Sequence, residues 1–168
     1  IRNLILIFLS IVFLGCQEPS DNKIAIVIHG GAGTILKENM TPELERSYFL
    51  KLEEAIRVGY DILKNGGSSK KAVEMTIHVM ENSPLFNAGH GAVLTSDGTA
   101  ELDASFMDGE TLDAGAIAGV KNIKNPISAA IAVMEKSPYV LLSSNGAEQF
   151  ASEVGLEIVP NSYFITER

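Results

Sequence analysis

The chain has 168 residues, of which 46% are hydrophobic and 20% charged, so it is long and apolar enough for one folded domain and is not a disordered chain. Its formal net charge of −8 disfavours nucleic-acid binding, because a protein needs a basic surface to displace the counterions of phosphates. The single cysteine, Cys16, excludes a disulfide within the chain.

The N-terminus predicts an export signal with a lipid anchor. Residues 4–15 form an apolar run that is too short to span a bilayer and has the length of a signal-peptide core. The run ends in Phe13-Leu14-Gly15-Cys16, which resembles a bacterial lipoprotein box. We therefore predict a lipoprotein signal peptide at 1–15 and a lipidated Cys16 with its tether at 16–22. This places the protein in the bacterial cell envelope, periplasmic or membrane-anchored. An ordinary secretory signal with a chance cysteine is the alternative.

The next part of the chain predicts one strand and two helices. Lys23–Ile28 is almost continuously apolar, which is typical of a buried strand, and it leads into a glycine loop at residues 29–33. A helix should begin at Thr41-Pro42, where a capping hydroxyl precedes a proline at the first helical position, and end at residues 65–67. A second helix, capped by Ser68 or Ser69, should end at Pro84.

The middle of the chain changes to the period of β-structure. Strands are predicted at 92–95, 99–107 and 112–120, with turns at 96–98 and 108–109. A helix at 127–136, a strand at 139–143, a helix at 146–154 and a strand at 156–159 should follow. Because hairpins are flanked by helices, the order predicts a layered α+β fold and fits an alternating parallel βα wind poorly. The small residues of 112–120 would let another layer pack closely on the sheet.

Common catalytic motifs are absent from the sequence. It contains no G-x-S-x-G pentad, no Walker loop and no complete dinucleotide fingerprint. The three histidines share no metal-ligand spacing, and His78, inside a predicted helix, is interpreted as structural. Glu101 and Asp103 should share a strand face, where a carboxylate pair could do acid–base work, but a polar sheet surface is the preferred interpretation. Either the protein is a binding module, or the reacting group lies on sequence outside this chain.

Five ordered segments, spread over about residues 23–159, resemble the α-subunit of plant-type L-asparaginase/isoaspartyl peptidase, an N-terminal-nucleophile hydrolase. These segments are Ile26–Gly33, Pro84–Gly91, Glu101–Gly109, Ala114–Val120 and Ile123–Ile127. The resemblance implies an α+β fold of the four-layer αββα type, with 23–168 as a C-terminally incomplete α-subunit half. It also implies a precursor that cuts itself before a threonine, whose hydroxyl is then the nucleophile and whose α-amine is its base. That threonine opens the β-subunit, so no catalytic residue lies in this chain, which should be inactive alone.

The resemblance assigns roles to particular positions. Asn87 would lie beside the active site, with His29, Gly30, Gly31 and Gly33 as supporting residues. The resemblance implies no catalytic cofactor. It does imply a structural sodium ion, which would be held by the backbone carbonyls of Met80, Glu81, Ser83, Phe86, Ala88 and His90.

The resemblance also implies partners and substrates. The partners are a β-subunit from the same precursor and a second αβ unit in an (αβ)2 dimer, with no nucleic acid and no membrane contact except through the lipid anchor. The substrates are asparagine or β-aspartyl (isoaspartyl) peptides. Glycosylasparaginase and a non-catalytic ligand-binding lipoprotein stay open as alternatives, and the Pro84–Gly91 segment favours the isoaspartyl branch.

Overall fold

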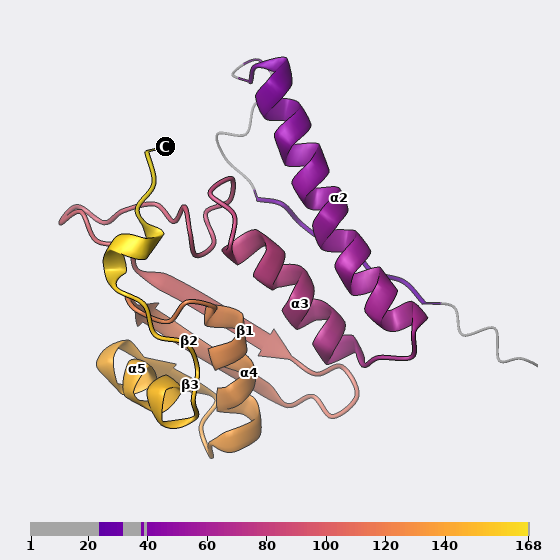
Figure 1. Ribbon diagram of the computed structural model, residues 1–168. Coiled ribbons are helices and arrows are strands. Elements are labelled where there is room, and N and C mark those ends of the chain that lie inside the picture. Colours follow the sequence, from indigo (N-terminus) through magenta and orange to yellow (C-terminus); the bar gives the residue numbers. More distant parts are fainter. Residues whose placement is uncertain (1–23, 32–37, 39, 168) are drawn as a thin grey trace, which may run out of the picture.

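The computed structural model describes residues 24–31, 38 and 40–167 (Figure 1). The predicted signal peptide, Cys16 and the tether lie outside this part of the chain. Within it, no helix is long and apolar enough to cross a membrane. The elements in chain order are α2 (Pro42–Lys64), α3 (Ser69–Glu81), β1 (Leu102–Met107), β2 (Ala114–Val120), α4 (Pro126–Lys136), β3 (Leu141–Ser143), α5 (Ser144–Glu153) and the 3-10 helix η2 (Asn161–Phe164).

Helices α2 and α3 form where the sequence predicts them, and they pack side by side (Figure 1). The hydroxyl of Thr41 accepts a hydrogen bond from the N–H of Leu44 at 3.2 Å, and Pro42 occupies the first turn. Ser68 caps α3 in the same way through the N–H of Lys71, also at 3.2 Å. The two helices approach closely at Gly59, where an added Cβ would lie 2.2 Å from the hydroxyl of Thr76. Helix α3 ends at Glu81, before the predicted end at Pro84.

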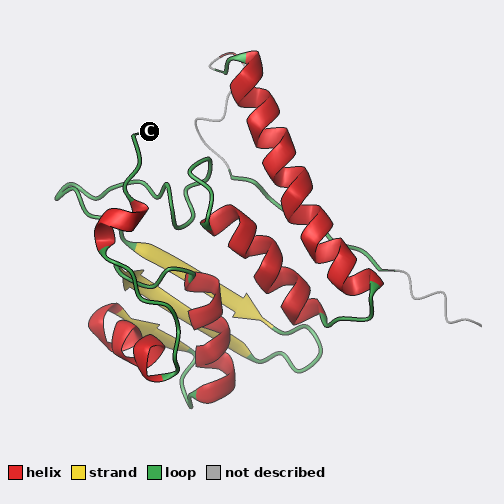
Figure 2. Ribbon diagram, in the orientation of Figure 1, coloured by secondary structure: helices red, strands yellow, loops and turns green. Residues whose placement is uncertain are grey.

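The sheet is mixed, with the strand order β1-β2-β3 (Figure 2). Strands β1 and β2 form the predicted antiparallel hairpin. Strands β2 and β3 are parallel and are joined through α4, so the sheet contains one parallel βαβ connection that the hairpin pattern does not predict. The described part of the chain is therefore α+β, as expected, with a small mixed sheet at its centre.

Three predicted strands do not form in the described residues. Residues 24–28 pair with no described strand, so that prediction is wrong, and Val27 is 91% exposed. The segments at 92–95 and 156–159 each make a single bridge, Leu94 with Ala100 and Ile158 with Ile123. Apolar sequence makes a segment extended, but a strand also needs a neighbour that takes its backbone hydrogen bonds.

The two faces of the sheet have different environments. Helices α4 and α5 cover one face, and the core there is built from residues such as Ile117, Val120 and Val133, none of them more than 1% exposed. Gly115 lets α4 lie directly on β2, since an added Cβ would be 2.2 Å from the carbonyl oxygen of Ala130. The opposite face is lined by half-buried or exposed side chains and is called here the open face. Its residues are Ser105, Met107, Ala114, Ala116, Ala118, Leu141 and Ser143.

Candidate functional site

The loop at residues 82–91, between α3 and the β1 hairpin, folds tightly on itself. The N–H of His90 donates to the carbonyl of Glu81 at 2.7 Å, which closes the loop against the end of α3. Gly89 has φ +84°, and an added Cβ would lie 2.5 Å from the carbonyl oxygen of Glu81. Gly91 has φ +118°, and a Cβ added there would lie 2.8 Å from the carbonyl oxygen of Pro84. Only glycine fits this combination of dihedral angle and close approach.

Asn87 presents an amide from this loop. Its Oδ1 accepts a hydrogen bond from the N–H of Val93 at 2.9 Å, which fixes the side chain across the loop. Its Nδ2 donates to no described residue. Asn87 is exposed and lines a hollow of about 480 Å³ together with Glu81, Asp103 and Ser105. The amide is therefore a positioned hydrogen-bond donor at the edge of the open face.

Glu81 ties this loop to α4. The side chain is only 3% exposed, and its two oxygens accept from the N–H of Ile127 at 2.9 Å and from Nδ2 of Asn125 at 3.0 Å. Burial raises the pKa of the Glu81 carboxyl to about 7, while the two hydrogen bonds favour its ionised form. A carboxylate at the first turn of a helix satisfies N–H groups that have no partner within the helix.

The second glycine loop lines a different hollow. Gly31 donates its N–H to Nδ1 of His29 at 3.3 Å, and Gly30 packs against the side chain of Leu52. Gly30 and Gly31 border a hollow of about 300 Å³ on α2, and Gly33 lies outside the described residues. An edge-on contact of Tyr48 in that hollow with Phe86 of the 82–91 loop, 5.8 Å between ring centres, links the two regions. Neither of these two hollows is lined by both His29 and Asn87.

The resemblance implies a small hard cation at the backbone of residues 80–91, where the carbonyls of Met80 and Glu81 already accept hydrogen bonds from the N–H groups of Ser83 and His90. The predicted donors are all carbonyl oxygens, which match the preference of such ions for oxygen ligands. The contacts of Gly89 and Gly91 with carbonyls of residues 81 and 84 show how closely the loop curls on itself. No group of three or more His, Cys, Asp or Glu side chains in the described part of the chain could hold a metal ion.

The acidic residues near the loop are engaged in structural contacts. Asp103 lies where the β1–β2 register shifts, and its Oδ1 accepts from the N–H of Gly119 at 2.8 Å. Glu101 forms an exposed ion pair with Lys121 at 3.0 Å. These contacts fit the interpretation of a polar sheet surface.

One polar cluster has the residue types of a hydrolase but not the arrangement. The hydroxyl of Ser128 donates to Oε1 of Glu74 at 2.7 Å and lies 2.8 Å from Nε2 of His78. Because the hydroxyl proton points at Glu74, Nε2 of His78 must be the donor and cannot act as the base of a nucleophilic serine. Burial lowers the pKa of His78. Sequence reasoning missed the cluster because Ser128 and Glu74 lie on different helices.

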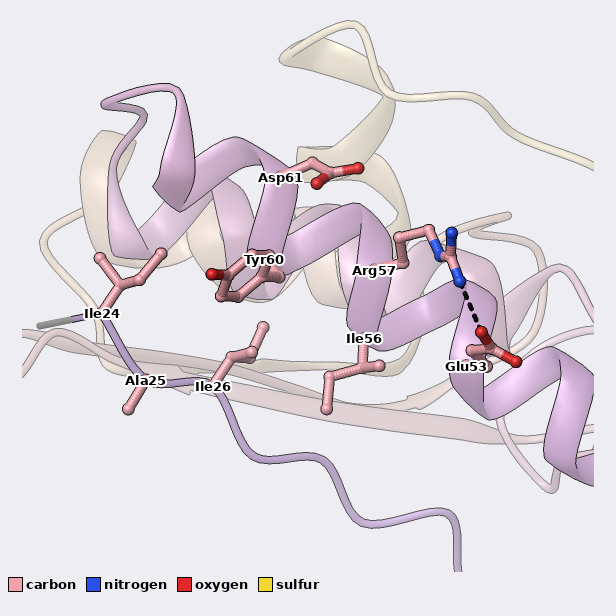
Figure 3. A pocket seen from close by; sticks show the side chains of 8 residues that line it. All are labelled: Ile24, Ala25, Ile26, Glu53, Ile56, Arg57, Tyr60 and Asp61. Atoms are coloured by element: carbon pink, nitrogen blue, oxygen red, sulfur yellow. Dashed lines mark hydrogen bonds and ion pairs between the residues drawn. The ribbon is translucent and has the colours of Figure 1, made fainter.

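A larger hollow, of about 630 Å³, lies between residues 24–26 and α2 (Figure 3). Its floor is formed by Ile24, Ile26 and Ile56, and Arg57 at the rim pairs with Glu53. No histidine, serine, threonine or cysteine lines it, so the hollow beside Asn87 is the better candidate for chemistry.

The sequence of the chain matches a known protein family. The profile of the asparaginase family matches residues 22–168. The chain is 46% identical over 146 residues to an isoaspartyl peptidase/L-asparaginase of Xenopus laevis, covering 87% of this chain and 46% of that protein. It is 48% identical over 145 residues to an isoaspartyl peptidase of Salmonella typhimurium, covering 86% and 46%. It is 51% identical over 132 residues to a plant-type L-asparaginase of Pyrococcus furiosus, covering 79% and 42%.

The chain therefore spans less than half the length of these curated relatives. Its match to the family profile nevertheless extends from residue 22 to its last residue and includes both glycine loops, Asn87 and the whole sheet. This chain belongs to the asparaginase family, of which it represents the N-terminal portion.

Proposed function

We propose that the whole protein is an amidohydrolase that cleaves the side-chain amide of L-asparagine and the β-aspartyl bond of isoaspartyl peptides. The observation that carries this proposal is the family match over residues 22–168, which includes the fixed Asn87 amide beside an open hollow. The Xenopus relative is named for both activities, and the Salmonella relative is named for the isoaspartyl peptidase activity.

The reacting group in this proposal is a threonine at the N-terminus of a downstream subunit. Its hydroxyl oxygen attacks the amide carbon and its own α-amine accepts the hydroxyl proton. The α-amine then passes this proton to the leaving nitrogen as the C–N bond breaks, which releases ammonia or the amine of a peptide. Water then cleaves the acyl ester, which releases an aspartyl product and restores the threonine. Asn87 would orient a substrate or backbone carbonyl beside this group through its Nδ2 donor.

The open face of the sheet supports the four-layer part of the proposal. It carries three alanines, with Met107 and Leu141 exposed at 60% and 56%. Small and apolar side chains of this kind suit a second sheet at about 10 Å. We place the strands of the downstream half against this face, which completes an αββα sandwich.

A sodium ion in the 80–91 loop is also part of the proposal. The backbone carbonyls of the six predicted residues would hold it, and its role would be to fix the loop that carries Asn87. Thermal unfolding of the full-length protein in sodium and in choline chloride tests this: the midpoint should be higher in sodium at equal ionic strength. The predicted lipid anchor at Cys16 rests on the sequence pattern alone.

Expression of the full-length gene product followed by intact mass measurement tests the class of enzyme. Two fragments should appear, the second beginning with threonine, and the mixture should hydrolyse L-asparagine and a β-aspartyl dipeptide. Preferential release of sugar from glycosylasparagine would instead assign a glycosylasparaginase. A single uncleaved chain that binds but does not hydrolyse these compounds would assign a ligand-binding lipoprotein.

A further inference from the structure

Helix η2 is held at one end of the β1–β2 hairpin by the side chain of Asn161. Oδ1 of Asn161 accepts a hydrogen bond from the N–H of Ala100 at 3.1 Å, and Nδ2 donates to the carbonyls of Ala100 and Lys121, both at 2.8 Å. Phe164, in the same helix, is fully buried in the core that also contains Val120. Because these contacts are made to the sheet and its core, η2 has a fixed place that does not depend on the 82–91 loop.

Two successive residues fasten the 82–91 loop to η2. Nδ1 of His90 lies 2.6 Å from the carbonyl oxygen of Tyr163, and the N–H of Gly91 donates to the carbonyl of Phe164 at 3.1 Å. The rings of His90 and Tyr163 are also in contact, with their centres 5.1 Å apart. Since a carbonyl oxygen only accepts hydrogen bonds, Nδ1 of His90 carries the proton and is the donor.

His90 holds the loop from two sides. Its backbone N–H donates to the carbonyl of Glu81 at the end of α3, and its ring donates to η2. Asn87 lies three residues before His90, and Val93, whose N–H donates to Oδ1 of Asn87, lies three residues after it. The bond between Asn87 and Val93 therefore closes a stretch of chain that has His90 at its centre, and a shift of His90 would move both ends of that bond.

We propose that His90 is a positioning residue, whose Nδ1–H bond to Tyr163 keeps the Asn87 amide directed into the hollow that it shares with Asp103 and Ser105. The inference rests on the proposed function, in which Asn87 orients a carbonyl beside the reacting threonine. It adds the contact that fixes Asn87 in that place. A group that acts on the transition state must be held within a fraction of an ångström, so the loss of one such contact affects the rate more than the stability.

A matched pair of substitutions isolates the ring donor. His90→Asn keeps it, because Nδ2 of asparagine is attached at the same distance along the side chain as Nδ1 of histidine. His90→Leu has nearly the size and shape of the asparagine variant but has no donor. Both variants retain the backbone N–H that binds Glu81. The control is Gly155→Ala, which has φ +81° and open space around it after α5, so it destabilises the fold without touching the loop.

Hydrogen exchange at the N–H of Val93 reports on Asn87 without requiring activity. It is measured in the full-length protein at constant sodium concentration, relative to the N–H of Val133 in α4. His90→Leu should speed the exchange of Val93 about tenfold, because the Asn87 oxygen no longer stays in place. His90→Asn should remain within about threefold of the wild type, since the donor is kept. Gly155→Ala should leave the ratio unchanged.

The kinetics of the processed enzyme test the consequence for catalysis. His90→Leu should lower kcat for a β-aspartyl dipeptide about tenfold or more and leave KM within about twofold, because the misplaced amide is missed chiefly in the transition state. His90→Asn should recover kcat to within about threefold. Gly155→Ala should lower the thermal midpoint and leave kcat unchanged. Self-cleavage that fails in His90→Leu and is normal in His90→Asn would support the proposal equally.

Three results would overturn the positioning role. They are an unchanged exchange of Val93 in His90→Leu, a normal kcat of that variant together with a lowered thermal midpoint, and a loss in His90→Asn as large as in His90→Leu. The second result is the one expected of a merely structural histidine. A wild-type protein that hydrolyses neither L-asparagine nor the dipeptide would instead overturn the proposed function, and the exchange of Val93 would still show whether the His90 ring holds Asn87.

Discussion

At the scale of single residues, the backbone of Ser144 is held in a conformation that serine disfavours. Its φ is +48°, at the point where β3 turns directly into α5. A residue with a Cβ is destabilised by roughly 1–2 kcal/mol in this left-handed region, and glycine by almost nothing. Ser143, its neighbour, has an ordinary extended φ of −139°. The two adjacent serines therefore form a matched pair for substitution.

Ser144→Gly should stabilise the fold by about 0.5–1 kcal/mol, because the relief of strain exceeds the added freedom of the unfolded chain. Ser143→Gly should destabilise it by a similar amount, because the conformation there needs no glycine. The midpoint of urea unfolding is the measurement. Equal effects of the two substitutions would show that the turn carries no strain.

The glycines of the 82–91 loop are constrained by space as well as by dihedral angle. Gly89→Ala should destabilise the chain by about 3 kcal/mol or more, because the new methyl group would collide with the carbonyl of Glu81 and φ is positive. Gly98→Ala shares a positive φ of +74° but meets nothing within 4 Å, so it should cost only about 1 kcal/mol. Thermal unfolding of both variants separates the two contributions, and similar losses would contradict a tightly packed loop.

At the scale of elements, the buried residue Glu81 connects α3, the 82–91 loop and α4. Its side-chain carboxyl accepts hydrogen bonds at the start of α4, and its backbone carbonyl accepts a hydrogen bond from the N–H of His90. The position of the Asn87 loop relative to the sheet thus depends on Glu81. This contact joins segments more than 40 residues apart, since Ile127 lies 46 residues after Glu81.

The stability of the chain should depend on pH through Glu81. Burial raises the pKa of the Glu81 carboxyl in the folded state to about 7, from an ordinary value of 4.5. Between these two values the folded state binds more protons than the unfolded state, so stability falls as the pH rises through this window and levels off above it. The loss is of the order of 3 kcal/mol, from about 1.4 kcal/mol for each pH unit.

Glu81→Gln should remove this dependence, because glutamine keeps the shape and does not titrate. We expect the difference in unfolding free energy between the native chain and this variant to change across pH 5 to 8, at constant sodium concentration. Urea unfolding at each pH provides the measurement. If the difference in unfolding free energy is the same at every pH from 5 to 8, the Glu81 carboxyl has an ordinary pKa in the folded protein.

At the scale of the whole molecule, the described residues form a layered arrangement with one sheet face left open. Helices α4 and α5 cover one face, α3 lies beside α4, and α2 lies outside α3 (Figure 1). The open face carries half-buried alanines at the centre of the sheet. If the downstream half of the protein packs there, this face decides whether the two halves assemble.

Ala116→Glu tests the role of the open face. Ala116 pairs with Ser105 on β1 and Leu141 on β3, so the new carboxylate would stand in the middle of the proposed sheet-to-sheet interface. In the full-length protein, self-cleavage and activity should fall more than tenfold, because burying an unpaired charge costs several kcal/mol. Thr111→Glu, in the exposed turn between β1 and β2, should leave both unchanged. Normal processing of Ala116→Glu would place the second layer elsewhere.

The sequence alone determined the local features of this protein. The caps at Thr41 and Ser68, the proline at the start of α4 and the β1–β2 hairpin are set by residues close to one another in the chain, so their patterns predict them. The ordered motifs also sufficed to indicate the asparaginase family. These features depend on short-range hydrogen bonding and on motif chemistry, which the sequence displays directly.

Only the tertiary structure decided which distant residues meet. The sequence predicts a strand at 23–28, yet no described strand pairs with residues 24–28, and the sequence does not predict that β3 runs parallel to β2. The contact of Glu81 with the start of α4, and the separation of the Asn87 and His29 loops into different hollows, likewise follow from packing. The physical reason is that strand pairing, burial and pKa shifts depend on neighbours supplied by remote segments, and a linear pattern does not specify those neighbours.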